Sequence, residues 1–112
     1  MSEMAVLRQV LDACGRGEVR LWRNNVGALE DKTGRIVRYG LCKGSSDLIG
    51  YRSVVVTPEM VGQRVAVFVA LEVKDKGRLT SEQAQFLNVV RQAGGIAAEV
   101  RSVEDARAAL RQ

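Results

Sequence analysis

Histidine is absent from this chain of 112 residues, and its absence excludes several kinds of site at once. Zinc sites built on His, Ser-His-Asp triads and Cys-His nucleophilic pairs all need an imidazole. Cysteine is scarce too. Cys14 and Cys42 form no C-x-x-C motif, and we expect them to be reduced structural thiols.

Aromatic residues and long apolar runs are also in short supply. One Trp, two Tyr and two Phe are few for a protein that stacks single-stranded bases on exposed rings. No apolar run approaches the ~20 residues of a membrane-spanning helix, and the N-terminus lacks the pattern of a signal peptide. We expect a cytoplasmic protein, in a bacterium or a phage-infected host cell, with no membrane partner.

Positive charge is what the chain has in excess. Its net charge is +4, and Arg supplies 13 of the 17 basic side chains. The planar guanidinium fork matches phosphate oxygens, so this composition suits a nucleic-acid partner, although a merely soluble basic protein could share it. The length and the 46% hydrophobic fraction fit a single domain over residues 1–112, with a real core and no linker.

Helix signals stand at both ends of the chain and in its second half. Ser2 can cap a helix that runs to about Cys14 and stops at Gly15. Thr80 or Ser81 can open a second helix that ends at Gly94-Gly95. Ser102 can open a third, which ends near Leu110.

Strand patterns fill the space between these helices. Residues 18–27 alternate, a turn follows at 30–34, and 35–40 reads as the partner strand. One or two strand segments are expected in 47–56, interrupted near Gly50, before Pro58 breaks the run. Residues 64–74 are apolar on both faces, which is typical of a central strand covered on two sides, and 96–101 is a last strand. The sequence predicts an α/β fold with a mixed central sheet flanked by helices.

The end of the apolar run 64–74 carries an acid and an amine. Glu72 and Lys74 project to the same side of a strand and lie ~6–7 Å apart along it, so both can reach a point just beyond its end. Asp47, at the start of a neighbouring strand, can add a second carboxylate. A salt bridge at a strand end is the simpler explanation of an E-x-K triplet taken alone.

Two carboxylates and the backbone carbonyl of Val73 form a hard, all-oxygen set of the kind that binds Mg²⁺ or Mn²⁺. Such a metal polarises a phosphodiester, and Lys74 could orient the attacking water or neutralise the charge that develops on the phosphate. Glu3 falls on the apolar stripe of the first helix and is a further candidate ligand. It could equally be a first-turn acid favoured by the helix dipole.

Three ordered segments resemble the VRR-NUC family (virus-type replication-repair nucleases) of the PD-(D/E)XK superfamily. They are Gly44-Ser45-Ser46-Asp47, Glu72-Val73-Lys74 and the helix opening Leu79 to Gln83. Residues 23–27, RNNVG, look like the family's R-x-N-x-G strand, and Glu3 matches an acid on its first helix. The interval between Asp47 and Glu72 is longer than in many members, which leaves the pairing of the middle strands open.

The resemblance implies a restriction-endonuclease-like core and a metal-dependent DNA endonuclease with Asp47, Glu72, Lys74 and Gln83 at its centre. Branched or flapped DNA, such as a Holliday junction, is the implied substrate. Gln83 shares the buried face of its helix, but it could also complete a Thr-x-x-Gln capping box with Thr80. Candidate phosphate contacts, which could instead be solvated surface, are Lys43, Ser45, Arg23, Arg38, Lys76 and Arg78.

Two other functions remain open at this point. A sequence-specific restriction-type endonuclease shares the core, but 112 residues leave little chain for a recognition domain. A non-catalytic DNA-binding subunit would not need its acidic and lysine positions intact. We also expect a symmetric homodimer, because one small domain offers a limited footprint for branched DNA. The apolar positions Val54 to Val56 and Met60 to Val61 could form its contact, or pack onto the chain's own sheet.

Overall fold

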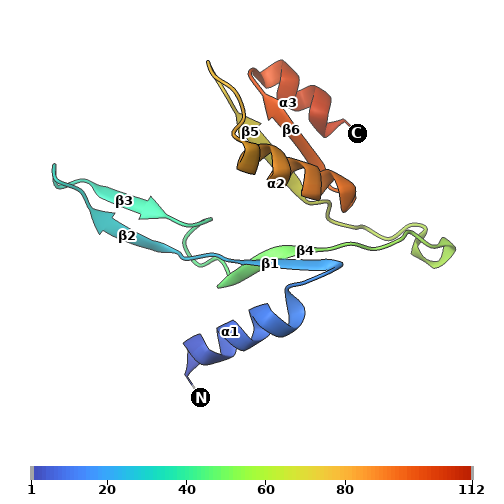
Figure 1. The fold of residues 1–112 in the computed structure, drawn as a ribbon, viewed down its shortest axis with the longest axis horizontal. Helices are drawn as coiled ribbons and strands as arrows, with labels where there is room; N and C mark the ends of the chain where they lie inside the picture. Colours follow the sequence, from blue (N-terminus) through green and yellow to red (C-terminus); the bar gives the residue numbers. More distant parts are fainter. Residues whose placement is uncertain (1, 112) are drawn as a thin grey trace. The chain divides into compact units, whose positions relative to one another are not determined.

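The computed structural model describes residues 2–111 and confirms the α/β class (Figure 1). The chain divides into two compact units, Met1–Arg52 and Ser53–Gln112. The first unit contains α1 (Glu3–Cys14), β1 (Val19–Arg23), β2 (Gly27–Glu30), β3 (Ile36–Tyr39) and β4 (Leu48–Arg52). The second contains the 3-10 turn η1 (Pro58–Met60), β5 (Val69–Val73), α2 (Ser81–Gln92), β6 (Ile96–Val100) and α3 (Val103–Leu110).

The strands of the described residues form three two-stranded sheets instead of the single mixed sheet that we expected. The pairs β1–β4 and β2–β3 are antiparallel, and β5–β6 is parallel. The parallel pair is connected by α2, as a parallel pair needs a crossover of a dozen or more residues.

A tight hairpin turn decides the pairing in the first unit. Asp31 Oδ1 accepts hydrogen bonds from Thr33 Oγ1 at 2.7 Å, Thr33 N at 2.8 Å and Arg35 N at 3.0 Å. The bond from the Thr33 hydroxyl, followed by the one from the Arg35 amide, lowers the pKa of Asp31. This turn joins β2 to its partner β3, while β1 is paired with β4. The predicted pairing of 18–27 with 35–40 was therefore wrong for its first half.

Strand β4 runs through Gly50 without the predicted interruption. Gly50 is paired with Leu21, and a Cβ at position 50 would collide with the carbonyl oxygen of Arg20. The glycine therefore lets β1 and β4 approach closely instead of breaking the strand. The rings of Trp22 and Tyr51 pack across the pair, with centroids 5.8 Å apart.

In the second unit, α2 packs on the parallel pair β5–β6 (Figure 1). Leu87 and Val90 of α2 are buried against Ala97 of β6, and Phe68, Ala70 and Leu79 pack around them. Strand β5 is shorter than the predicted strand 64–74, because β6 offers only five residues to pair with it. Val73 is 74% exposed, so β5 is not the doubly covered strand that its apolar sequence indicated.

All three predicted helices and their caps are confirmed. The hydroxyl groups of Ser2, Thr80 and Ser102 accept hydrogen bonds from the amides of Ala5, Gln83 and Asp105, at 3.1, 3.1 and 3.0 Å. Each bond satisfies a donor that the helix itself leaves unpaired. Across residues 2–111, no helix combines the length and apolar character needed to cross a bilayer.

Candidate functional site

The Glu72-Val73-Lys74 triplet lies at the carboxyl end of β5, as predicted. Its neighbour in the sheet is a second triplet of the same kind, Glu99-Val100-Arg101. The parallel register places Glu72 opposite Glu99 and Val73 opposite Val100. Lys74 N donates to Val100 O at 3.1 Å, which continues the ladder one residue beyond the strand. Two acids and two bases therefore lie side by side at one end of the sheet.

Glu72 faces the helix α2. Residues two apart on a strand share a face, and Ala70 packs with Leu87 and Val90, so the side chain of Glu72 is directed to that face as well. Here Glu72 borders a hollow of about 270 Å³ between β5 and α2. The hollow is lined by Ala70, Leu71, Glu72, Glu82, Gln83, Phe86 and Leu87.

Gln83 forms the predicted capping box and also lies at the hollow beside Glu72. Thr80 N donates to Gln83 Oε1 at 2.9 Å and Gln83 N donates to Thr80 Oγ1 at 3.1 Å, so the predicted capping box is present. The same side chain lines the hollow with Glu72. The capping bond uses Oε1 and leaves the orientation of the amide fixed, with the two Nε2 hydrogens as its remaining donors.

The carbonyl of Val73 points away from β6. Ile96 N donates to Phe68 O and Lys74 N donates to Val100 O, so the even-numbered residues of β5 make the ladder to β6. Successive carbonyl groups of a strand point to opposite edges, and β6 is the only strand paired with β5 among residues 2–111. The Val73 oxygen is therefore directed to the outer edge of β5, next to the Glu72 position.

Arg101 is a residue of this region that sequence reasoning missed. Its guanidinium donates to Glu99 Oε1 at 2.6 Å, to Asp75 O at 2.9 Å and to Gly77 O at 2.7 Å. It thereby neutralises the acid beside Glu72 and ties down the loop that follows Lys74. The signal in the sequence was the repetition of LEVK (71–74) as AEVR (98–101), on two strands that turned out to be in register.

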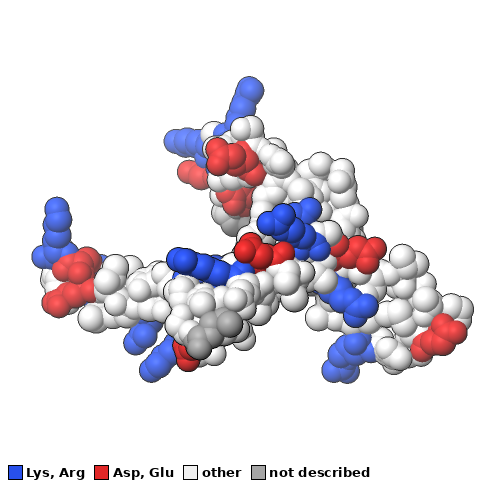
Figure 2. Space-filling view, turned by 60° about the horizontal axis from the view of Figure 1, so that its bottom comes forward, with Lys and Arg blue, Asp and Glu red and all other residues white. Residues whose placement is uncertain are grey.

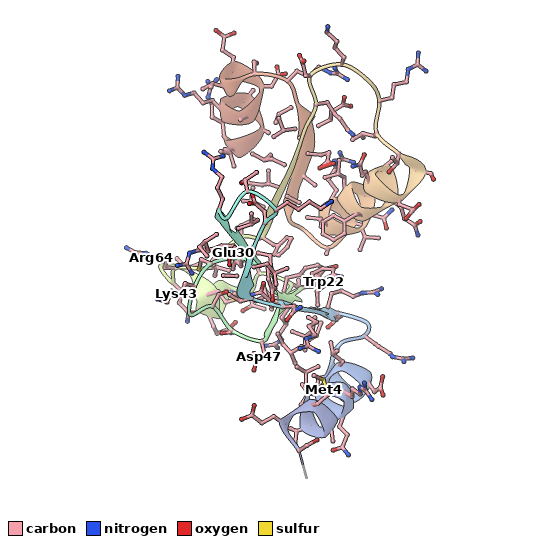
Figure 3. All side chains as sticks on the ribbon, turned by 90° about the vertical axis from the view of Figure 1, so that its left-hand side faces the viewer. Met4, Trp22, Glu30, Lys43, Asp47 and Arg64 are labelled. Carbon is pink, nitrogen blue, oxygen red and sulfur yellow. The ribbon has the colours of Figure 1, made fainter. Side chains whose placement is uncertain are left out.

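The other predicted carboxylate, Asp47, belongs to the first unit, where it is exposed just before β4 on the loop that carries Lys43 (Figure 3). Asn24 N donates to Asp47 O at 2.8 Å, which extends the β1–β4 ladder. Lys43 and Arg38 line one hollow of about 380 Å³ beside the ends of β2 and β3. Two of the predicted phosphate contacts thus lie in the same concavity.

The remaining candidates lie on exposed surface. Arg23 Nη1 is 3.3 Å from Met4 Sδ, so its guanidinium is directed to α1 (Met4 is labelled in Figure 3). Lys76 and Arg78 are exposed on the loop after β5. Glu3 is exposed in the first turn of α1, where its charge complements the helix dipole. In Figure 2, Lys and Arg side chains form separate groups with Asp and Glu side chains between them.

The donor chemistry at the end of β5 fits a hard cation. Glu72 offers a carboxylate and Val73 a carbonyl, both oxygen ligands. No group of three or more Cys, Asp or Glu residues in the described part of the chain gathers in a way that could hold a metal ion. Mg²⁺ commonly keeps several waters and takes only one or two protein carboxylates plus substrate phosphates. A site with few protein ligands is therefore compatible with Mg²⁺.

Comparisons with protein-family models, with curated proteins and with solved structures found no match. The functional assignment of this chain consequently rests on its own residues and on their arrangement within each unit.

Proposed function

We propose that this chain is a Mg²⁺- or Mn²⁺-dependent endonuclease that hydrolyses phosphodiester bonds in DNA. The observation that supports it most is the arrangement at the end of β5. Glu72 and Gln83 border one hollow, and Lys74 follows Glu72 by two residues, directly after the end of β5. An acid, an amide and an amine at one strand end, beside an outward-directed carbonyl, are a suitable set for positioning a phosphate and a hard cation.

Each residue has a distinct role in this proposal. The carboxylate of Glu72 and the carbonyl of Val73, at the end of β5, are the proposed metal ligands of the second unit. The carboxylate of Asp47, before β4, is the proposed metal ligand of the first unit. The bound cation supplies Lewis acidity, which polarises the phosphate and makes a water more acidic. Lys74 stabilises the negative charge that develops as water adds to phosphorus and the bond to the leaving oxygen breaks. Gln83 donates through its amide to the phosphate or to the attacking water.

The proposed substrate is branched or flapped DNA, held by its phosphates. Arg38 and Lys43 line one hollow and are suitable for a backbone phosphate. We further propose a restriction-endonuclease-like PD-(D/E)XK core and a symmetric homodimer. Support for the dimer comes from an exposed apolar segment, in which Val55, Val56 and Val61 are 86%, 76% and 84% exposed. Their exposure favours a contact with a second copy over packing on the chain's own sheet.

A cleavage assay with labelled four-way junction, flap and linear duplex tests this function. The full chain with Mg²⁺ or Mn²⁺ is expected to cut junction or flap, and EDTA should stop cleavage. Glu72→Gln should abolish it, while Glu104→Gln, an exposed acid in the first turn of α3, should leave it unchanged. Binding without cleavage in either metal would indicate a non-catalytic subunit, and cleavage of duplex at one sequence would indicate a restriction-type enzyme.

A further inference from the structure

The side chain of Asn24 is hydrogen-bonded to both ends of the loop between β3 and β4. Leu41 N donates to Asn24 Oδ1 at 2.9 Å. Asn24 Nδ2 donates to Ser45 Oγ at 2.7 Å and to Ser46 O at 3.0 Å. Both hydrogens and the oxygen of the amide are therefore engaged, and they hold the two ends of the loop together.

Ser45 closes the same loop from the inside. Its hydroxyl donates to Cys42 O at 2.6 Å, its amide donates to the same oxygen at 3.0 Å, and Cys42 N donates to Ser45 Oγ at 3.3 Å. The single hydroxyl hydrogen is committed to Cys42, so Ser45 Oγ has no second hydrogen to donate to a DNA phosphate. In this arrangement the serine supports the loop.

These bonds converge on the residues around Asp47. The side chain of Asn24 is hydrogen-bonded to Ser45 and Ser46. The backbone N–H of Asn24 donates to Asp47 O at 2.8 Å. Three consecutive residues before β4 are therefore fixed to one residue that follows β1. The carboxylate of Asp47 is itself exposed, so its position depends on the backbone that carries it.

We propose that Asn24 and Ser45 are positioning residues that hold the loop 41–47 in the form in which Asp47 binds the metal ion and Lys43 meets phosphate. The inference rests on the proposed role of Asp47. A carboxylate on a mobile loop loses backbone freedom when it binds a cation, whereas a loop already ordered by hydrogen bonds does not. Partners that orient a metal ligand typically change metal affinity by 10–100-fold.

Two adjacent serines provide a matched pair for the test. Ser45→Ala removes the hydroxyl that three hydrogen bonds use, whereas Ser46→Ala keeps the backbone oxygen that Asn24 binds. The readout is paramagnetic broadening of the Asp47 amide signal by Mn²⁺ alone, without DNA. Ser45→Ala and Asn24→Ala should each raise the half-broadening Mn²⁺ concentration by about 10-fold. Ser46→Ala should leave it unchanged, and Ser45→Thr, which retains a hydroxyl, should restore the wild-type value.

Hydrogen exchange of the Leu41 amide provides a second readout, and thermal unfolding shows which variants fold. Asn24→Asp keeps the acceptor for Leu41 N but removes both Nδ2 donors, so it should weaken Mn²⁺ binding while Leu41 stays protected. If Ser45→Ala and Asn24→Ala fold and match wild type in Mn²⁺ binding, while Asp47→Ala abolishes broadening, the positioning role is overturned and the metal role of Asp47 stands. If Mn²⁺ broadens the amide signal of residue 47 equally in wild type and Asp47→Ala, or broadens it in neither protein, the metal role of Asp47 fails. The positioning role then fails with it.

Discussion

Glu72 lies directly opposite Glu99 in the parallel pair β5–β6, and both side chains are on the same face of the sheet. Like charges in such a position repel each other and lower stability by a few tenths to about 1 kcal/mol. Arg101, 2.6 Å from Glu99, offsets part of this repulsion. An acid beside another acid at a strand end is therefore unfavourable for folding.

The first prediction concerns Glu72. Glu72→Gln should abolish metal-dependent cleavage and leave the free energy of unfolding unchanged or raise it by up to about 1 kcal/mol, because the repulsion with Glu99 is relieved. Chemical denaturation and the junction assay measure the two effects. Full activity in the variant would remove Glu72 from the site.

The second prediction concerns Lys74. Lys74→Ala should still bind Mn²⁺ and DNA but should cleave at least ~10²-fold more slowly, because a cation that stabilises the transition-state charge is lost. Lys32→Ala, in the turn between β2 and β3, is the matched control and should cleave at the wild-type rate. An unchanged rate in Lys74→Ala would remove this side chain from the proposed chemistry.

The third prediction concerns Arg101. Arg101→Ala should lower the free energy of unfolding by about 1–2 kcal/mol, because it removes charge-assisted bonds to Asp75 O and Gly77 O. The freed loop should be cut faster by trypsin after Lys76 and Arg78, which limited proteolysis measures. Arg107→Ala, an exposed arginine of α3, should not change the cutting rate. Equal cutting rates in Arg101→Ala and Arg107→Ala would contradict the role of Arg101 in holding this loop.

The fourth prediction concerns salt. DNA affinity should fall steeply between low and physiological ionic strength, because binding through phosphates releases counterions. Arg38→Ala and Lys43→Ala should each reduce the slope of log affinity against log salt by about 1. Fluorescence anisotropy in EDTA measures binding without cleavage. A slope that is flat in wild type, or that neither substitution changes, would argue against phosphate contacts in their hollow.

The fifth prediction concerns oligomeric state. Light scattering at micromolar concentration should give twice the monomer mass of 12.2 kDa. Val55→Asp should shift it toward the monomer, since Val55 is 86% exposed in the proposed contact. Val103→Asp, at a 67% exposed valine of α3, should remain a dimer. A wild-type mass near 12.2 kDa, with and without DNA, would rule the dimer out.

Local features of the fold could be read from the sequence because local chemistry determines them. The caps at Ser2, Thr80 and Ser102 and the capping box of Gln83 depend on residues at most three positions apart. The location of Glu72-Val73-Lys74 at a strand end followed from the change from apolar to charged residues. These features needed no knowledge of distant contacts.

Pairing between distant segments could not be read in the same way. The alternating pattern of 18–27 is equally compatible with either partner, and the bonds of Asp31 decided between them. The length of β5 depended on its partner β6 and not on its own apolar residues. Likewise, the bonding partners of Asn24 and Arg101 could not be read from the sequence, because they lie 17 to 26 positions away.

The bonds of Asn24 also limit how long the following loop can be. The side-chain amide of Asn24 accepts from Leu41 N and donates to Ser46 O at the same time. The chain from 41 to 46 must therefore begin and end within the span of one side chain. Gly44, with φ +84, makes the turn inside that span. Insertions or deletions in this segment would separate the two ends or strain the turn, whereas the β2–β3 turn at 31–35 closes through Asp31 alone. One asparagine thus fixes loop length as well as loop shape.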